Sequence, residues 1–265
     1  MAKNKEHMSR ISVLHYFKLL FRSALLIAAT VLYVVARVNG VKSPFATMAS
    51  RPVLLVIIWA VFVFEMALRF FPSRLESMGC QKQFKRNYRP TGEETPRLQS
   101  AKTTFLVAAV WLLLNGAIAA LYYTHLIDAG ILILISLFYS VCDMICILFF
   151  CPFQTWFMKN KCCGSCRIYN WDYAMMFTPL AFIVDFYTWS LLGIALLLLL
   201  VWELSLRLHP ERFSEATNEC LSCANCKEKL CHHKRQLRHF LRTHKEILLL
   251  KGNTMVEKAK KRREK

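Results

Sequence analysis

Apolar residues along this chain gather in blocks that are as long as a membrane-spanning helix. A helix needs about 20 mainly apolar residues to cross the hydrocarbon core of a bilayer. Four blocks meet this requirement, and polar or charged residues bound each of them: 20–38, 52–71, 103–124 and 129–150. The pattern predicts an all-α fold in which the chain forms a polytopic bundle of membrane-spanning helices.

A fifth apolar block, 174–208, is too long for one ordinary crossing. As a single helix it would measure about 50 Å, whereas the hydrocarbon core is about 30 Å thick. Pro179, Asp185 and Gly193 are positions at which such a helix can break. Two interpretations remain open. One is a hairpin, made of two short crossings or of a re-entrant piece and a return, and the other is one long tilted helix.

The net charge of +18 lies outside the apolar blocks. Segment 73–102 holds seven Lys and Arg against three Glu, and the N-terminus and the C-terminal tail are basic as well. Because basic loops stay on the cytoplasmic side, we predict a multi-pass protein of the inner or plasma membrane with this loop and both termini in the cytoplasm. An even number of crossings satisfies this rule, which favours the hairpin.

The same charge indicates contact with anionic lipid headgroups. Basic segments also occur in nucleic-acid-binding proteins, but a membrane protein has its own reason to be basic, so no nucleic-acid partner is predicted. The basic stretch before residue 20 is long, and no small-residue cleavage signal follows the first block. We therefore expect a retained helix and not a signal peptide.

Composition divides the chain into five segments. They are a basic N-terminus (1–19), a four-helix transmembrane region (20–150) that includes the loop 73–102, a Cys-rich loop (151–173), a hydrophobic hairpin or long helix (174–208) and a Cys/His-rich basic tail (209–265).

Seven of the eleven cysteines fall in two dense clusters, and Cys151 precedes the first. The loop cluster is Cys162, Cys163 and Cys166, and the tail cluster is Cys220, Cys223, Cys226 and Cys231, followed by His232 and His233. Cysteines separated by two residues can turn their thiolates toward one metal ion or cluster. In the reducing cytoplasm such thiols do not pair into disulfides, so the two clusters predict a metal centre.

The spacing of the tail cluster, Cys220-x2-Cys223-x2-Cys226-x4-Cys231, resembles bacterial ferredoxin ligation. Cys151-Pro152-Phe153 directly after an apolar block resembles the helix-end motif of membrane-anchored polyferredoxins of the nitrate and nitrous-oxide reductase type. The resemblance implies that Cys151 and the seven clustered cysteines hold two [4Fe–4S] clusters. It further implies electron transfer between a soluble carrier and the membrane quinone pool or a partner subunit.

Zinc is the alternative cofactor. The Cys163/Cys166 and Cys220/Cys223 pairs would then clamp the loop to the tail, with His232 and His233 available as substitute ligands. Such a structural site suits a membrane transporter or an assembly factor. Thiol-redox chemistry or heavy-metal handling by the same cysteines is a third interpretation.

Three other cysteines lie outside the clusters. Cys80 is expected to be a surface thiol of the loop 73–102. Cys142 and Cys146 lie four positions apart in the block 129–150, on one helical face, and are expected to pack as small apolar residues.

Each ionisable residue within an apolar block is expected to have a partner or a functional role, because charge is costly inside a bilayer. Glu65 lies four positions before Arg69, which suggests a local ion pair. Asp143 has no such neighbour, and Asp185 interrupts the fifth block. These two aspartates are the candidates for a proton or cation path, with hydrogen bonds between helices as the alternative role. Asn115 is expected to join two helices by a hydrogen bond.

Other sites receive little support. Haem ligated by two histidines is not predicted, because no histidine lies inside an apolar block and His125 lies only near the end of one. The chain has no nucleotide-binding glycine motif, hydrolase elbow or HExxH motif, so the sequence assigns no enzymatic reaction. The stretch 169–172 is expected to be an interfacial anchor in which Asp172 caps the next helix. Segment 227–250 has the pattern of a basic amphipathic helix that lies on the membrane surface.

Overall fold

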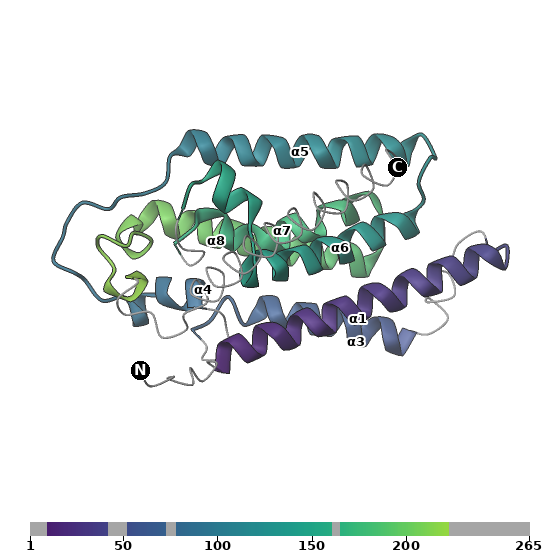
Figure 1. The fold of residues 1–265 in the computed structure, drawn as a ribbon, viewed down its shortest axis with the longest axis horizontal. Coiled ribbons are helices and arrows are strands. Elements are labelled where there is room, and N and C mark those ends of the chain that lie inside the picture. Colours follow the sequence, from purple (N-terminus) through teal and green to yellow (C-terminus); the bar gives the residue numbers. More distant parts are fainter. Residues whose placement is uncertain (1–9, 42–51, 73–77, 161–164, 223–265) are drawn as a thin grey trace, which may run out of the picture.

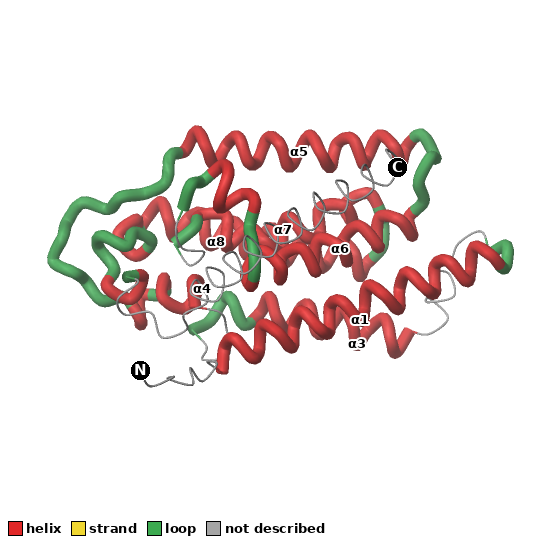
Figure 2. The backbone as a smooth tube through the Cα atoms, in the orientation of Figure 1, coloured by secondary structure: helices red, strands yellow, loops and turns green. Residues whose placement is uncertain are grey.

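The protein is represented by a computed structural model that describes residues 10–41, 52–72, 78–160 and 165–222 (Figure 1). The described residues form helices joined by loops and turns, without a β-strand (Figure 2). The predicted all-α class is therefore confirmed for this part of the chain.

Four helices of the described part are long and apolar enough to cross a membrane: α1 (Arg10–Val38), α5 (Ala101–Tyr123), α6 (Ala129–Leu148) and α8 (Phe186–Leu208). Helix α3 (Pro52–Ala67) is also apolar, but its 16 residues extend only about 24 Å. It is shorter than the predicted block 52–71 because the chain turns after Ala67, through backbone bonds such as that from Arg69 N to Met66 O.

Short helical segments complete the described fold. They are α4 (Met78–Gln83), η1 (Lys85–Asn87), the π-helical turn η2 (Phe153–Phe157), η3 (Arg167–Trp171), α7 (Asp172–Phe177), η4 (Thr178–Phe182), η5 (Pro210–Arg212) and η6 (Glu219–Leu221).

The fifth apolar block is broken into a short irregular piece and a long return helix. The piece is α7 followed by η4, which contains Pro179, and Phe182 at its end packs against Tyr123 at the end of α5. The Asp185 side chain then accepts a hydrogen bond from Tyr187 N at 2.9 Å and caps α8, which runs back along the bundle. The block is thus broken at Asp185, as the hairpin interpretation expects, and does not form one continuous helix, while Gly193 lies inside α8 without interrupting it.

The loops before α5 and α7 and the segment after α8 lie together at one end of the bundle (Figure 1). The buried Asn218 amide donates to the carbonyl oxygens of Lys82 and Arg212, at 3.0 and 2.8 Å. The Gln99 amide donates to the Ser165 carbonyl oxygen at 3.3 Å. The Cys-rich loop and the beginning of the tail therefore lie at the same end of the bundle, as an even number of crossings requires.

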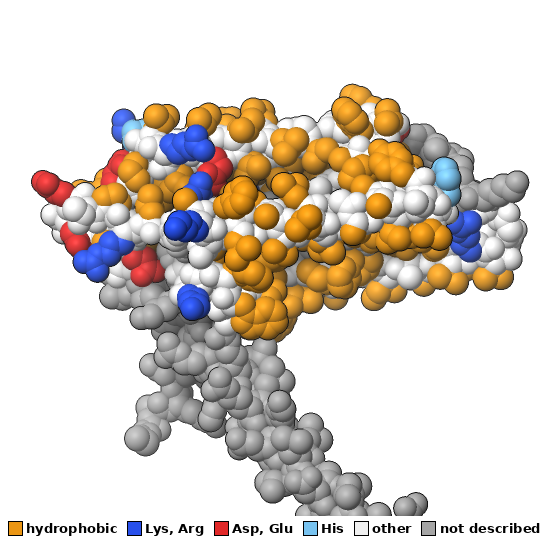
Figure 3. Space-filling model, turned by 90° about the horizontal axis from the view of Figure 1, so that it is seen from above, with side chains coloured by type: hydrophobic (Ala, Val, Ile, Leu, Met, Phe, Trp, Pro, Cys, Tyr) orange, Lys and Arg blue, Asp and Glu red, His pale blue; other side chains and the backbone are white. Residues whose placement is uncertain are grey.

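The face of the bundle drawn in Figure 3 is apolar along its length, with charged side chains gathered toward the ends. In α5, Phe105 is 75% exposed and Leu113 is 74% exposed. An apolar surface of this extent suits the hydrocarbon of a bilayer and not water. The interior core packs α3, α7 and α8 around Met66, Met176 and Leu198.

Candidate functional site

A cavity of about 130 Å³ lies between α5, α6 and the segments that flank α7. Four cysteines line it. Cys142 and Cys146 belong to α6, Cys151 lies in the turn after α6, and Cys166 directly precedes η3. Two carboxylates, Asp143 and Asp172, and two methionines, Met175 and Met176, also line it.

Local structure explains why these thiols converge. Residues four apart on a helix share a face, so Cys142 and Cys146 both turn toward the cavity. The helix ends at Leu148, and the following turn returns Cys151 to the same place, where the Cys146 and Cys151 thiols line the cavity together, close enough to interact. The Cys151 sulfur also accepts the backbone N–H of Gln154 at 3.4 Å. The predicted role of Cys142 and Cys146 as packing residues is therefore incomplete.

The walls of the cavity are largely aromatic. Trp111, in the middle of α5, packs against Tyr139 of α6 with ring centroids 4.7 Å apart and ring planes tilted by 55°, and its indole N–H donates to the Thr178 hydroxyl at 3.3 Å. Phe153 and Tyr169 contribute further rings. An apolar cavity of roughly 150 Å³ binds benzene, so the volume of this cavity is comparable to that needed by a single six-membered ring.

The structure brings together only part of the predicted metal-ligand set. Cys151 and Cys166 share the cavity, whereas the Cys220 thiol donates to the carbonyl oxygen of Asn87, at 3.1 Å. The remaining predicted ligands lie outside the described residues: Cys162, Cys163, Cys223, Cys226, Cys231, His232 and His233. Within the described ranges, no group of three or more His, Cys, Asp or Glu is arranged to hold a metal ion.

Cys80 is not the surface thiol that was expected. It is fully buried, and its thiol lies 3.8 Å from the carbonyl oxygen of Arg69 in the turn after α3. It packs in the core cluster around α8 because α4 folds back against the end of the bundle.

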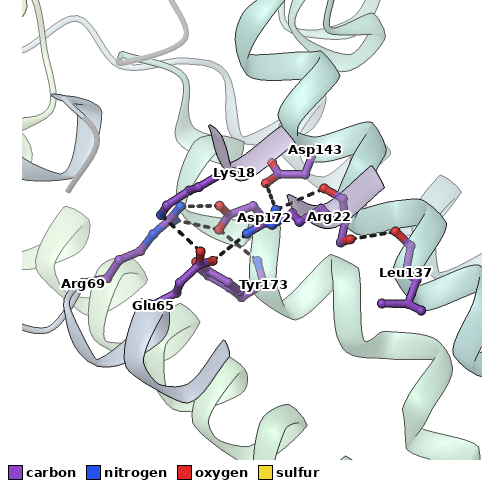
Figure 4. A network of polar contacts seen from close by, with 9 residues as sticks. Lys18, Arg22, Glu65, Arg69, Leu137, Asp143, Asp172 and Tyr173 are labelled. Carbon is purple, nitrogen blue, oxygen red and sulfur yellow. Dashed lines mark hydrogen bonds and ion pairs between the residues drawn. The ribbon is translucent and has the colours of Figure 1, made fainter. Parts of the chain in front are cut away.

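A buried polar network lies next to the cavity (Figure 4). Arg22 of α1 is 1% exposed, and its guanidinium donates to Glu65 of α3 at 2.8 Å and to Asp143 of α6 at 3.1 Å. The same group donates to the carbonyl oxygen of Ser140, at 3.1 Å. One arginine therefore ties three helices together at the level of the cavity.

A second pair continues the network toward α7. Arg69 donates to both carboxylate oxygens of Asp172, at 2.7 and 2.5 Å, and lies 4.6 Å from the centroid of the Tyr173 ring. The Tyr173 hydroxyl donates to Glu65 at 2.9 Å.

The network is balanced in charge. Its three cations and three carboxylates are Lys18, Arg22, Arg69, Glu65, Asp143 and Asp172, with the Lys18 ammonium 3.6 Å from Glu65. Pairing of this kind is the condition on which charged groups persist in a low-dielectric interior. The predicted local pair of Glu65 with Arg69 is wrong, because each of these side chains pairs with a residue from another segment.

The other predicted polar residues have separate positions. Asp185 is exposed at the N-terminus of α8, at the opposite end of that helix from the loops, so it does not share a path with the cavity-lining Asp143. The Asn115 amide donates to the Trp111 carbonyl oxygen within its own helix and not across helices. Asp172 is held by Arg69 through its side chain, which replaces the expected capping role.

Sequence reasoning missed Arg22 and the partners of Arg69. A signal was present, because Arg22 lies inside the first apolar block and Lys18 precedes it by one helical turn. Two cations on one face of an apolar helix require acidic partners, and Asp143 was the acidic residue for which the sequence showed no cationic partner.

Comparison of the chain with protein-family models, with curated proteins and with solved structures finds no match.

Proposed function

We propose that the protein is an integral membrane electron-transfer protein in which Cys146 and Cys151 form a redox-active thiol pair that reduces a membrane quinone. The observation that carries this proposal is the cavity itself. It combines two thiols that contact each other, walls made of aromatic rings and a volume that suits one ring. It lies among helices long enough to cross a membrane.

The chemistry is that of a dithiol and a two-electron acceptor. The S–H bonds of Cys146 and Cys151 break and one S–S bond forms, while the quinone takes up two electrons and two protons and becomes a quinol. A soluble dithiol carrier then reduces the disulfide by thiol–disulfide exchange and leaves as a disulfide itself. Electrons thus pass from a soluble donor to a lipid-soluble acceptor.

The basic loops favour a cytoplasmic position for the end of the bundle that carries the Cys-rich loop. A reducing compartment on that side would supply the dithiol carrier. The same basic residues would contact anionic lipid headgroups and draw an acidic carrier to the inner or plasma membrane.

A metal centre shared by the loop and tail clusters is the second candidate. The contacts of Asn218 and Gln99, which hold the tail, the loop 73–102 and the Cys-rich loop at one end, favour it. Iron–sulfur clusters would retain the electron-transfer function, whereas zinc would clamp the loop to the tail in a transporter or an assembly factor. Iron and zinc analysis of anaerobically purified protein separates these cases.

The test of the thiol pair uses reduced protein in detergent and a short-chain benzoquinone. We expect quinol, measured by absorbance, and a Cys146–Cys151 disulfide, measured by peptide mass spectrometry, in equal amounts. Cys146→Ser and Cys151→Ser should each abolish both products. Cys220→Ser is the matched control, because this thiol lies outside the cavity, where it donates to the carbonyl oxygen of Asn87, and it should react like the wild type.

Quinol formation that persists in Cys146→Ser would refute the thiol pair. So would a disulfide that links other cysteines while these two remain reduced. A brown, iron-containing protein whose quinone reduction survives Cys146→Ser but is lost in Cys151→Ser would instead support the iron–sulfur candidate, in which Cys151 is a ligand and Cys146 is not.

A further inference from the structure

Asp143 is the carboxylate nearest in the sequence to the thiol pair, and it lines the same cavity. It lies one position after Cys142 and three before Cys146, so a single helical face of α6 presents its carboxylate and the Cys146 thiol together. The cavity is also lined by Asp172, but both oxygens of that carboxylate bond Arg69.

One oxygen of Asp143 is held in place. Oδ2 accepts a hydrogen bond from Arg22 at 3.1 Å, and no other hydrogen bond to this carboxylate occurs among the described residues. The Arg22 guanidinium does not release its proton, so it acts here as a fixed donor that orients the carboxylate. The arrangement leaves Oδ1 available to a group in the cavity.

The charged and titratable groups around Asp143 come from four segments. Arg22 faces it from α1, Arg69 from the turn after α3 and Asp172 from α7, while Cys142, Cys146 and Tyr139 come from its own helix. Cys151, in the turn after α6, and Cys166, which directly precedes η3, face the same cavity.

From this geometry we infer that Asp143 is the proton acceptor of the thiol pair, positioned by Arg22. The inference rests on the proposed function. Asp143 takes the proton of Cys146, the resulting thiolate adds to the quinone ring, and Cys151 attacks the Cys146 sulfur to form the disulfide. The carbon–sulfur bond breaks, the bond's electron pair stays with the quinol, and the protons from Asp143 and Cys151 go to the two quinol oxygens.

The first measurement is the rate of quinol formation as a function of pH. General-base catalysis contributes roughly 100-fold or more, so Asp143→Asn should slow the reaction by about that factor and remove the acidic limb of the pH profile. Asp143→Glu should recover part of the rate. Asp185→Asn is the matched control, because this carboxylate caps α8 far from the thiols, and it should leave the profile unchanged.

A second measurement keeps the inference separate from the quinone. N-Ethylmaleimide alkylates thiols without any quinone, and its rate at Cys146 depends on removal of the thiol proton. A base at position 143 predicts slower alkylation in Asp143→Asn. A carboxylate that acted only as a neighbouring negative charge would oppose thiolate formation, so its removal would speed alkylation and overturn the inference.

The two proposals fail in different ways. If the wild-type protein forms no quinol but its alkylation slows in Asp143→Asn, quinone reduction is refuted and the role of Asp143 as proton acceptor is supported. Normal quinol formation in a folded Asp143→Asn protein, with an unchanged pH profile, refutes the base and retains the thiol pair. Where Asp143→Asn does not fold, the double variant Arg22→Met, Asp143→Asn removes both members of the buried pair, and a pH profile and alkylation rate equal to the wild type overturn the inference.

Discussion

Replacement of Arg22 by methionine tests whether the buried network holds the helices together. Methionine retains most of the length of the side chain but removes the charge and the donors. The change leaves Asp143 without its only hydrogen-bonding cation among the described residues, while Glu65 keeps Lys18 at 3.6 Å and the Tyr173 hydroxyl at 2.9 Å. The loss therefore falls mainly on the contact between α1 and α6.

The magnitude follows from burial. The Arg22 side chain is 2% exposed, and the carboxylates that it pairs with, Glu65 and Asp143, are 12% and 14% exposed. Removal of one partner from a buried pair costs about 3–5 kcal/mol, because the remaining charge stays in a low-dielectric environment. Neutralisation of both carboxylates in the triple variant Arg22→Met, Glu65→Gln, Asp143→Asn should restore most of this free energy.

The assay is reversible unfolding in detergent micelles by sodium dodecyl sulfate, followed by circular dichroism. Arg97→Met is the matched control, because Arg97 pairs with Glu93 on the surface and its side chain is 81% exposed. Such surface pairs contribute about 0–1 kcal/mol. If Arg22→Met lowered the free energy of unfolding no more than Arg97→Met, or if the triple variant were less stable than the single one, the reasoning would be refuted.

Three further predictions use other parts of the structure. Arg69→Lys keeps the charge but loses the two-pronged bond to Asp172, so it should lower the free energy of unfolding by about 1.5–3 kcal/mol in the same assay, and an unchanged value would contradict the geometry. Leu132→Ala opens a cavity at a fully buried position of α6 and should cost about 2–5 kcal/mol, measured in the same way. Epitopes inserted after Gly92 and after His125 should become accessible from opposite sides of the membrane, and labelling from one side only would contradict the helix order.

Much of the candidate site was visible in the sequence only as separate pieces. Cys151 and Cys166 belonged to a recognised thiol-rich loop, and Asp143 was conspicuous as a lone acid in an apolar block. Cys142 and Cys146 were interpreted as packing residues, because a cysteine in a membrane helix carries no local sign of the cavity that it faces. The cavity depends on how α5, α6 and α7 meet, which no single segment determines.

The sequence by itself determined the class of the protein and the course of its long helices. Hydropathy is a property of each segment, and a bilayer requires every apolar block of sufficient length to satisfy its own backbone as a helix. Pro179 and Asp185 likewise marked, by their local backbone chemistry, positions at which the last block can break, and the charge of the loops favoured a hairpin there.

Only the tertiary structure decided which charges and thiols meet. Arg22 and Asp143 are 121 positions apart and Arg69 and Asp172 are 103 apart, and spacing along the chain gives no information about such contacts. The packing of the helices selects these partners, because an unpaired charge inside the bundle would destabilise every alternative arrangement. The same packing returns Cys151 to Cys146 and places Asp143 beside them.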